Sequence, residues 1–315
     1  MTQQFLQLLL NGFITGTVLA LAGVGATLVF GIQRVANFAH GELLTFGAYA
    51  GLLLNVVLRQ NIVVSALTAM FATAALALAL HLAVLHPLRG RGLVATSLIT
   101  VGLGLMLRDV VFLIAGSELH AYRLDQFVVY DLGLIRISPG QAIAIALAVV
   151  VTPSLTVMLA RTRLGKSMRA TADNRDLAAV AGIDVDRIGR QVWLLAGALA
   201  GLGGVMTAIV QGVFDPNLGS QILFMILTTV VLGGIGSAYG TLVGGIALGL
   251  VMELSTWSGF AGGLDAKYKP VLAFLSLILL LLWRPQGLFG RARVRRSATF
   301  FRRCRRGRWG QLCCR

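Results

Sequence analysis

Charged residues are scarce in this chain. Only 12% of its 315 residues are Asp, Glu, Lys or Arg, whereas 57% are hydrophobic and the mean hydropathy is +0.83. A soluble domain of this length needs more surface charge, so the composition excludes a soluble protein. Cysteine is absent from residues 1–290. This absence excludes a disulfide framework or a cysteine-based metal cluster in that part of the chain.

Catalytic motifs are also missing. The sequence has no GxSxG, no HExxH and no cysteine nucleophile in residues 1–290, and its carboxylates are scattered singly. ARTRLGKS at 160–167 resembles a loosened phosphate-binding loop, but a membrane helix and bulky residues replace the buried strand and small residues that such a loop requires. We therefore predict a protein that is not an enzyme, with no ATP site, no cofactor and no metal of its own.

Long apolar runs are abundant. Many approach the ~20 residues that cross a bilayer, and they lack the two-residue alternation of barrel strands. The sequence predicts an all-α integral membrane fold, a polytopic bundle of about eight transmembrane helices. The expected spans are about 6–32, 43–58, 62–86, 93–115, 138–160, 191–211, 222–252 and 268–283. Small-residue pairs four apart, such as Gly12/Gly16 and Gly245/Gly249, are expected to pack helices together.

The segment 222–252 is too long for one crossing and contains GGIGSAYG at 233–240. A glycine-rich run disfavours a straight helix, so we predict a broken helix near 233–240. Irregular backbone at membrane depth is tolerated where it is buried in protein or lines a water-filled route, which makes this break a candidate part of the translocation path. The alternative is a tight cytoplasmic turn. The candidate path residues here are Gly233, Gly234, Gly236 and Ser237.

Residues 161–190 interrupt the apolar chain with seven basic and four acidic residues. The Lys/Arg bias places this loop in the cytoplasm and the N-terminus outside. Leu164, Met168 and Ala172 form an apolar stripe at four-residue spacing, and Asn174 is expected to cap a second short helix that ends at Gly182. Such a helix pair could insert a ridge into a groove of a soluble partner, or it could lie on lipid headgroups.

Residues 291–315 carry ten arginines, no acid and all three cysteines, Cys304, Cys313 and Cys314. Without them the net charge of +15 falls to +5, from 17 basic and 12 acidic residues, so a nucleic-acid partner is not indicated. We expect this tail to be disordered. It is either a lipid-binding basic run or a read-through from an unrelated frame. The domains expected are thus a membrane domain, 1–290, and the tail.

Two polar groups interrupt the spans. Asn37, His40 and Glu42 cluster in VANFAHGEL and are candidate path residues, although helix capping by Asn37 is a simpler role. Arg108 and Asp109 lie about two thirds of the way along the fourth span. Ionisable residues at depth suggest function, but we interpret this pair as marking the outer membrane interface.

Three separated blocks resemble one family, the LivH-type membrane subunits of branched-chain amino-acid ABC importers. They are GATLVFGIQRVANFAHGELLTFGAYA at 25–50, RTRLGKSMRATADNRDLAAVAGID at 161–184 and GGIGSAYGTLVGGIALGLV at 233–251. RPQGLFG at 284–290 resembles the family's C-terminal ending, whereas the arginine-rich tail departs from the pattern.

The resemblance implies a multi-pass permease of the bacterial inner membrane. Its implied partners are two cytoplasmic ABC ATPase subunits, a second related permease chain forming a heterodimer, a periplasmic substrate-binding protein and the lipid bilayer. It also implies that the loop at 161–184 couples to the ATPase. The coupling residues we assign are Arg161, Gly165, Met168, Arg169, Ala170, Asn174, Ala178 and Gly182.

The cargo and the transport class have alternatives. An importer of the same class could carry urea, short amides or a sugar, because a few pocket residues decide the cargo. A stand-alone channel or secondary transporter is the alternative from another class; it would need inverted repeats or intramembrane charge pairs, and neither is clear in the sequence.

Overall fold

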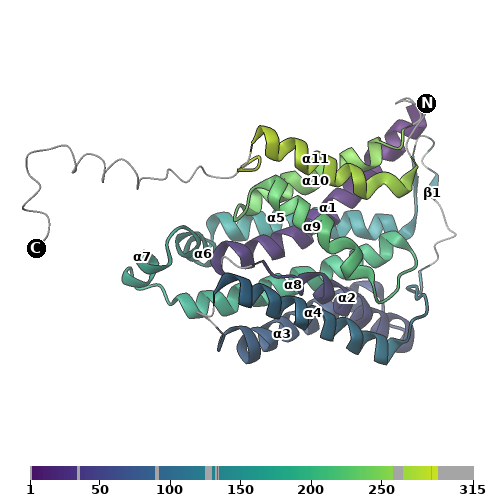
Figure 1. Cartoon of the computed structure of the whole chain (residues 1–315). Coiled ribbons are helices and arrows are strands. Elements are labelled where there is room, and N and C mark those ends of the chain that lie inside the picture. The colour runs from purple at the N-terminus through teal and green to yellow at the C-terminus, as the bar shows by residue number, and fades with distance from the viewer. Residues whose placement is uncertain are drawn as a thin grey trace, which may run out of the picture.

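The computed structural model describes residues 2–33, 36–88, 92–124, 130, 131, 133, 135–257, 265–284 and 286–289. The predicted tail at 291–315 lies outside these residues, as does part of RPQGLFG. The apolar helices of the described chain pack side by side into one bundle (Figure 1). They are α1 (Thr2–Gln33), α2 (His40–Leu52), α3 (Ile62–Leu80), α4 (Leu93–Ala115), α5 (Pro139–Arg161), α8 (Val185–Gln211), α9 (Leu218–Gly233), α10 (Ala238–Leu254) and α11 (Lys269–Trp283).

The predicted all-α membrane fold is confirmed. Within the described residues, six helices are long and apolar enough to cross a membrane, while α9 and α10 are shorter apolar helices. The count of eight spans is not confirmed, because the predicted span 222–252 consists of two helices and α2 has only 13 residues. Short π-helical turns, Leu53–Val57 and His81–Leu85, extend α2 and α3, and a 3-10 turn, Ala266–Tyr268, precedes α11.

Burial divides the bundle into a centre and a periphery. In α1 and α8, 78% and 83% of the most apolar window is buried, whereas the corresponding values are 17% for α4 and 6% for α11. Helices that are apolar on every side yet exposed are typical of segments that face lipid or another membrane subunit. The centre of the molecule is therefore formed by α1 and α8, against which α2, α3, α9 and α10 pack.

Small residues bring α1 and α10 together. A Cβ added to Gly16 would lie 2.7 Å from the Cα of Ile246, and one added to Gly249 would overlap the backbone of Gly16. The predicted packing role of these glycines is confirmed, since only a residue without a side chain permits this backbone approach.

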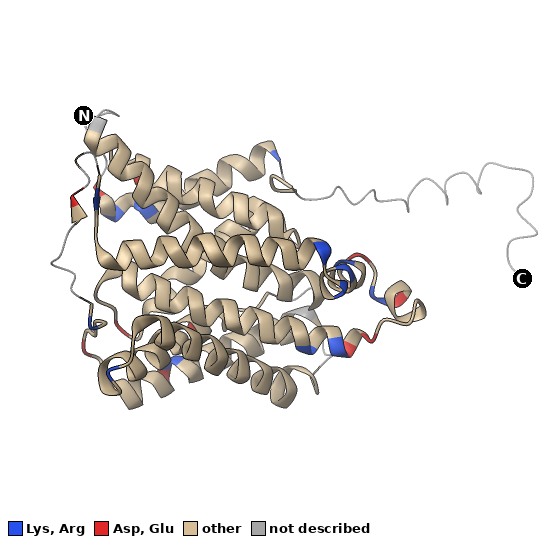
Figure 2. Cartoon of the chain, turned by 180° about the vertical axis from the view of Figure 1, so that it is seen from behind, with Lys and Arg blue, Asp and Glu red and all other residues tan. Residues whose placement is uncertain are grey.

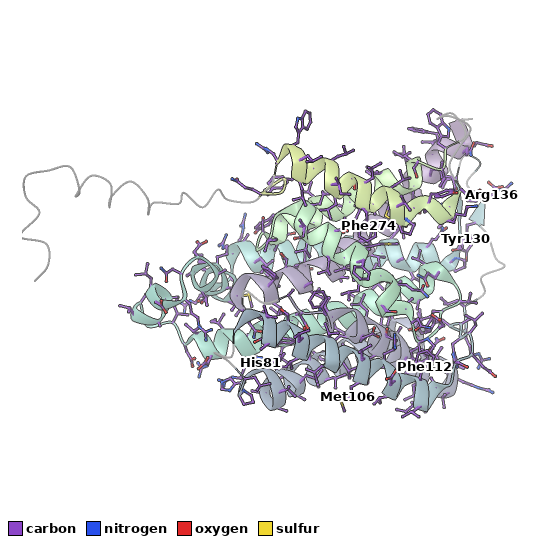
Figure 3. The ribbon with its side chains drawn as sticks, viewed as in Figure 1. His81, Met106, Phe112, Tyr130, Arg136 and Phe274 are labelled. Atoms are coloured by element: carbon purple, nitrogen blue, oxygen red, sulfur yellow. The ribbon has the colours of Figure 1, made fainter. Side chains whose placement is uncertain are left out.

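The two ends of the bundle differ in character. A pair of short polar helices, α6 (Arg163–Asp173) and α7 (Arg175–Val180), projects from one end, and the N-terminus lies at the other (Figure 1). Lys and Arg gather on α6 and the neighbouring helix ends (Figure 2). Tyr130 and Arg136, in the antiparallel strands β1 (Tyr130–Asp131) and β2 (Arg136–Ile137), mark the opposite end (Figure 3). The charged loop and Arg136 thus occupy opposite ends of the bundle.

Candidate functional site

The projecting segment folds as its cap residues predict. Asn174 Oδ1 accepts hydrogen bonds from the amides of Asp176 and Leu177, at 3.0 and 3.1 Å, and so starts α7. Gly182 follows the helix with φ of +84°, a conformation that favours glycine, and the Ile183 amide donates to the Ala178 carbonyl. The predicted cap at Asn174 and stop at Gly182 are confirmed.

The apolar stripe of α6 faces the protein itself. Met168 is only 2% exposed, and Leu164 and Ala172 are half-buried against the core. The prediction that this stripe forms an exposed ridge is wrong, because the end of the bundle covers it. Sequence periodicity identifies the apolar face of a helix but not the surface that covers it.

The exposed apolar side chains lie on α7 instead. Leu177 is 66% exposed and Val180 is 87% exposed. They stand beside charged groups, including an ion pair between Arg175 Nη2 and Asp186 Oδ1 at 3.5 Å. Sequence analysis did not select these two residues, because six-residue α7 is too short for a clear periodic pattern.

The predicted coupling residues separate into two groups. Gly165, Met168 and Ala178 are buried; a Cβ on Gly165 would overlap the backbone of Leu159. The other predicted residues are exposed along the segment: Arg161, Arg169, Ala170, Asn174 and Gly182. The buried group holds the helix pair on the bundle, and the exposed group is available to a partner.

The polar group at the start of α2 lies deep in the bundle. His40 Nε2 is 2.9 Å from the carbonyl oxygen of Ala22, eleven residues before the end of α1 at Gln33. At 1.5 Å per residue, α2 therefore begins about 16 Å inside that end. Irregular backbone at this depth needs internal partners. The Phe38 amide donates to Thr100 Oγ1 at 3.2 Å, and the Ala39 amide donates to Asn37 Oδ1 at 3.2 Å.

Asn37, His40 and Glu42 are 7%, 0% and 6% exposed. Asn37 Nδ2 and His40 Nδ1 are buried without a hydrogen-bond partner among the described residues. Thr45 Oγ1 donates to Glu42 Oε2 at 3.3 Å, and Glu42 also interacts electrostatically with Arg108. These residues therefore form a buried polar cluster and do not line an open surface.

Arg108 and Asp109 form an ion pair, with 3.7 Å between Arg108 Nε and Asp109 Oδ1. The helix continues beyond them to Ala115, and the apolar side chains Leu113 and Ile114 in this continuation are 85% and 82% exposed. The pair thus lies within the apolar stretch of α4, which differs from the expectation that it marks the outer end of the span.

The glycine-rich break predicted near 233–240 is a separate feature of the bundle. It is a turn between α9 and α10, at the end of the bundle that carries α6 and α7. The Gly236 amide donates to Thr27 Oγ1 at 3.1 Å, and a Cβ on Gly31 would lie 3.3 Å from Gly236 Cα and 4.0 Å from Ala172 Cβ. The helix break near 233–240 is confirmed. Its form agrees with the alternative expectation of a tight turn.

The candidate path residues in this turn make structural contacts. A Cβ on Gly233 would overlap Gly240, and the Gly233 carbonyl accepts a hydrogen bond from the Phe289 amide at 3.1 Å. Gly234 has φ of +102°, and the hydroxyl of Ser237 caps α10 through the Gly240 amide at 3.1 Å.

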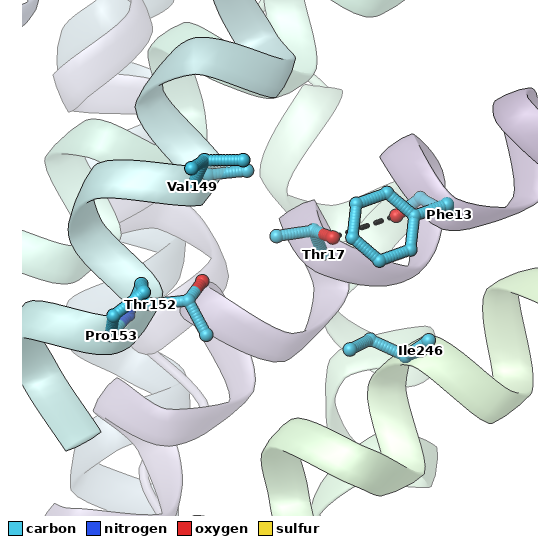
Figure 4. Close-up of a pocket in the computed structure, with 7 residues that line it drawn as sticks. Phe13, Thr17, Val149, Thr152, Pro153 and Ile246 are labelled. Atoms are coloured by element: carbon cyan, nitrogen blue, oxygen red, sulfur yellow. Dashed lines mark hydrogen bonds between the residues drawn. The ribbon is translucent and has the colours of Figure 1, made fainter.

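A cavity of about 220 Å³ lies between α1, α5 and α10 (Figure 4). Sequence analysis did not identify it, because no charged or titratable residue lines it. The one available signal was Pro153, a helix-breaking residue inside a span, next to Thr152. The lining includes Phe13 and Thr17 from α1, Val149, Thr152 and Pro153 from α5, and Ile246 from α10.

No group of three or more His, Cys, Asp or Glu side chains that could hold a metal occurs in the described part of the chain. The described surfaces are suited to binding a partner or a small molecule and to relative movement of helices. The relevant features are an exposed α7, a buried polar start of α2 and an apolar cavity between helices.

Comparison with known proteins identifies the family. The model of the family described as "Branched-chain amino acid transport system / permease component" matches residues 8–281. The high-affinity branched-chain amino acid transport system permease protein BraD of Pseudomonas aeruginosa is 31% identical over 92% of this chain and 97% of its own length. LivH of Escherichia coli K12, which carries the same description, is 30% identical with the same coverage.

More distant similarities exist. The ribose import permease protein RbsC of Escherichia coli K12 is 27% identical over 84% of this chain and 82% of its own length. A solved structure, PsaBC from Streptococcus pneumoniae in complex with Fab, matches with a TM-score of 0.45 and 16% identity, covering 88% of this chain and 90% of that one. The match over residues 8–281 and the two relatives at 30% identity or more show that this chain, a multi-pass protein of the inner membrane, belongs to the branched-chain amino-acid transport system permease family.

Proposed function

We propose that this chain is the membrane subunit of an ATP-driven importer of branched-chain amino acids. Separate cytoplasmic ABC ATPase subunits would hydrolyse ATP, a second related permease chain would complete the membrane domain, and a periplasmic binding protein would deliver the cargo. The family membership supports the transport role. The projecting α7 is the single structural observation that carries the ATPase coupling.

The coupling surface we propose is α7 with the exposed residues around it. The apolar side chains of Leu177 and Val180 are 66% and 87% exposed. Insertion of exposed apolar helix residues into a groove of a partner removes this area from water. The exposed predicted residues, Arg161, Arg169, Ala170, Asn174 and Gly182, would form the polar rim of the same contact.

The buried face of α6 would transmit the motion. Met168 and Gly165 fix α6 to the bundle, so a push on α7 would not be absorbed by a loose loop. From Ala172 the contact continues to Gly31 at the end of α1 and then to Gly236 in the α9–α10 turn. We propose that the turn residues Gly233, Gly234, Gly236 and Ser237 act as a joint at the inner end of the path.

The buried cluster of Asn37, His40 and Glu42 would belong to the same moving core. It holds the start of α2 at mid-depth, between α1 and α4. In alternating access, the displacement of α1 relative to α2 would open one side of the path and close the other.

Co-purification tests the coupling. Leu177→Asp combined with Val180→Asp should abolish recovery of the ATPase with the permease, while membrane insertion stays normal. Leu119→Asp is the matched control, because Leu119 is 70% exposed and lies in the loop that follows α4. Met168→Asp is unsuitable, since a charge at a 2% exposed site would unfold the segment. Undiminished ATPase recovery with the double variant would contradict the assignment.

A second cargo class is a sugar, which the similarity to the ribose import permease favours at lower identity. Uptake into vesicles that contain the whole assembly, with leucine, urea and ribose offered through matching binding proteins, distinguishes the classes. We expect ATP-dependent uptake of leucine. Uptake by this chain alone without ATP would instead indicate a channel or secondary transporter.

A further inference from the structure

The helix α4 (Leu93–Ala115) lies at the periphery of the bundle, with one face covered by α2 and the opposite face exposed. On the covered side, Thr100 Oγ1 accepts the Phe38 amide at 3.2 Å, and a Cβ on Gly104 would lie 3.6 Å from Glu42 Cγ. The opposite side, the α4 face, consists of exposed residues spaced three or four apart: Leu98, Gly102, Leu105, Asp109 and Leu113. Met106, beside this face, lies at the edge of the bundle (Figure 3).

A charged side chain lies within the α4 face. The Asp109 side chain is 66% exposed, and the residues one turn before and after it, Leu105 and Leu113, are 48% and 85% exposed. Ionisable side chains within membrane spans almost always face protein or a water-filled cavity, because hydrocarbon solvates a carboxylate poorly. Lipid alone is therefore an unsuitable cover for this face.

The charge of Asp109 is only partly compensated by the neighbouring Arg108. The distance from Arg108 Nε to Asp109 Oδ1 is 3.7 Å, which is longer than a hydrogen bond. Arg108 also interacts electrostatically with the buried Glu42, so two carboxylates share one guanidinium group. Adjacent residues of a helix do not face each other, and the Asp109 carboxylate therefore remains open to the outside. It favours a cation or a hydrogen-bond donor from another molecule.

The other two strongly exposed spans lack such a charge. Only 22% of the most apolar window is buried in α5, and 6% in the segment that contains α11. Residues 140–160 of α5 and 270–283 of α11 contain no Asp, Glu, Lys or Arg, so their exposed surfaces suit lipid. On the α4 face, a Cβ added to Gly102 would meet no atom within 4 Å. Space beside a glycine within a span allows the backbone of a second helix to approach closely.

We propose that the α4 face packs against a transmembrane helix of the second permease chain, which presents a Lys, Arg or hydrogen-bond-donating side chain to Asp109. The inference rests on the proposed function, from which the second chain comes. Such a helix would pair the exposed carboxylate and fill the space beside Gly102, whereas an acyl chain would leave the carboxylate unpaired. A symmetric contact between two copies of this chain would bring a second Asp109 to the same face, which disfavours a second copy.

Gly102→Phe tests the contact by shape. No atom lies within 4 Å of a Cβ at this position, so the isolated variant should keep its melting temperature. Recovery of this chain with the co-expressed, affinity-tagged second permease chain should fall roughly tenfold, the scale of an overpacked helix contact. Val150→Phe on α5 and Leu279→Phe on α11 are matched controls, since these side chains are 65% and 58% exposed. Both should leave recovery unchanged.

Asp109→Leu tests the charge separately from the shape. It leaves the cation or donor of the second chain without its acceptor, so recovery should fall roughly tenfold or more, as for loss of one member of a buried charge pair. Asp109→Glu keeps the carboxylate and should retain most of the recovery. The melting temperature of each isolated variant shows whether its fold is intact.

Photo-cross-linking identifies the molecule that covers the face. Benzoylphenylalanine in place of Met106, which is 63% exposed beside the α4 face, should form an adduct with the second permease chain. The same group in place of Leu279 should not.

The outcomes separate this inference from the proposed function. If the wild-type chain recovers the second permease chain but Gly102→Phe or Asp109→Leu recovers it equally well, the assigned contact is wrong. An adduct from position 106 with lipid alone or with a second copy would also overturn it. If the wild type recovers no second chain, the proposed heterodimer fails, together with the partner assigned to α4.

Discussion

Single glycines decide how closely the central helices approach. The added Cβ of Gly249 would overlap Gly16, whereas Gly102 on α4 has no atom within 4 Å of such a position. Both residues are glycines within helices, but only Gly249 has the backbone of another helix packed against it. The sequence pattern correctly predicted that Gly245 and Gly249 pack against another helix, since the four-residue spacing puts both glycines on one face.

Gly249→Ala should destabilise the protein, and Gly102→Ala should not. Overpacking of a close helix contact costs about 1–3 kcal/mol, because the backbones must separate. In open space the same change gains helix propensity, by up to about 1 kcal/mol. Thermal unfolding of the detergent-purified variants measures both effects; equal melting temperatures would contradict the packing role of Gly249.

At the scale of the elements, α11 belongs to the least embedded of the six segments that are long and apolar enough to cross a membrane. Ala273 is its buried residue, and its most apolar window is only 6% buried. Polar contacts attach its two ends. Lys269 Nζ lies 2.7 Å from Glu253 Oε1 at the end of α10, and the Leu288 amide donates to the Leu232 carbonyl at 2.9 Å. These polar contacts add to a small apolar interface, in which the ring centroid of Phe274 lies 6.3 Å from that of Phe224 in α9.

Lys269→Met should loosen α11, because Glu253, at 8% exposure, would lose its charged partner. Hydrogen bonds to charged groups contribute about 1.5–3 kcal/mol, so we expect a clear loss of stability. Lys267→Met is the control, since its pair with Asp265 is exposed on both sides. Hydrogen exchange of the α11 amides should increase only in Lys269→Met; unchanged exchange there would argue against this attachment.

Elements also show where sequence reasoning succeeded and failed. Composition and run length predicted the helices, and Asn174 and Gly182 predicted the ends of α7, because these signals are local. The burial of Met168, the depth of His40 and the cavity beside Val149 depend on which distant helices pack together. Residue periodicity carries no information about such tertiary neighbours.

For the whole molecule, positive charge is distributed unevenly along the sequence. The body retains a net charge of +5, whereas the tail supplies ten arginines. Ten of the fifteen net positive charges thus come from residues 291–315.

Truncation after Gly290 should leave membrane insertion, thermal stability and leucine uptake unchanged. It should weaken binding to anionic vesicles, since each basic residue near such a surface contributes about 1 kcal/mol. Flotation with vesicles that contain phosphatidylserine measures the second effect, with neutral vesicles as the control. A loss of uptake on truncation would show that the tail takes part in transport.

The short α2 has a consequence for biogenesis. Together with the π-helical turn Leu53–Val57 that continues it, α2 extends about 27 Å, slightly less than the roughly 30 Å of a hydrocarbon core. Ten of the 13 residues of α2 are buried in the protein. Because the start of α2 is held by Ala22 of α1 and Thr100 of α4, its final depth can be reached only after α4 has been synthesised. Assembly of the bundle centre would therefore be completed late, around a helix that enters the protein and not the lipid.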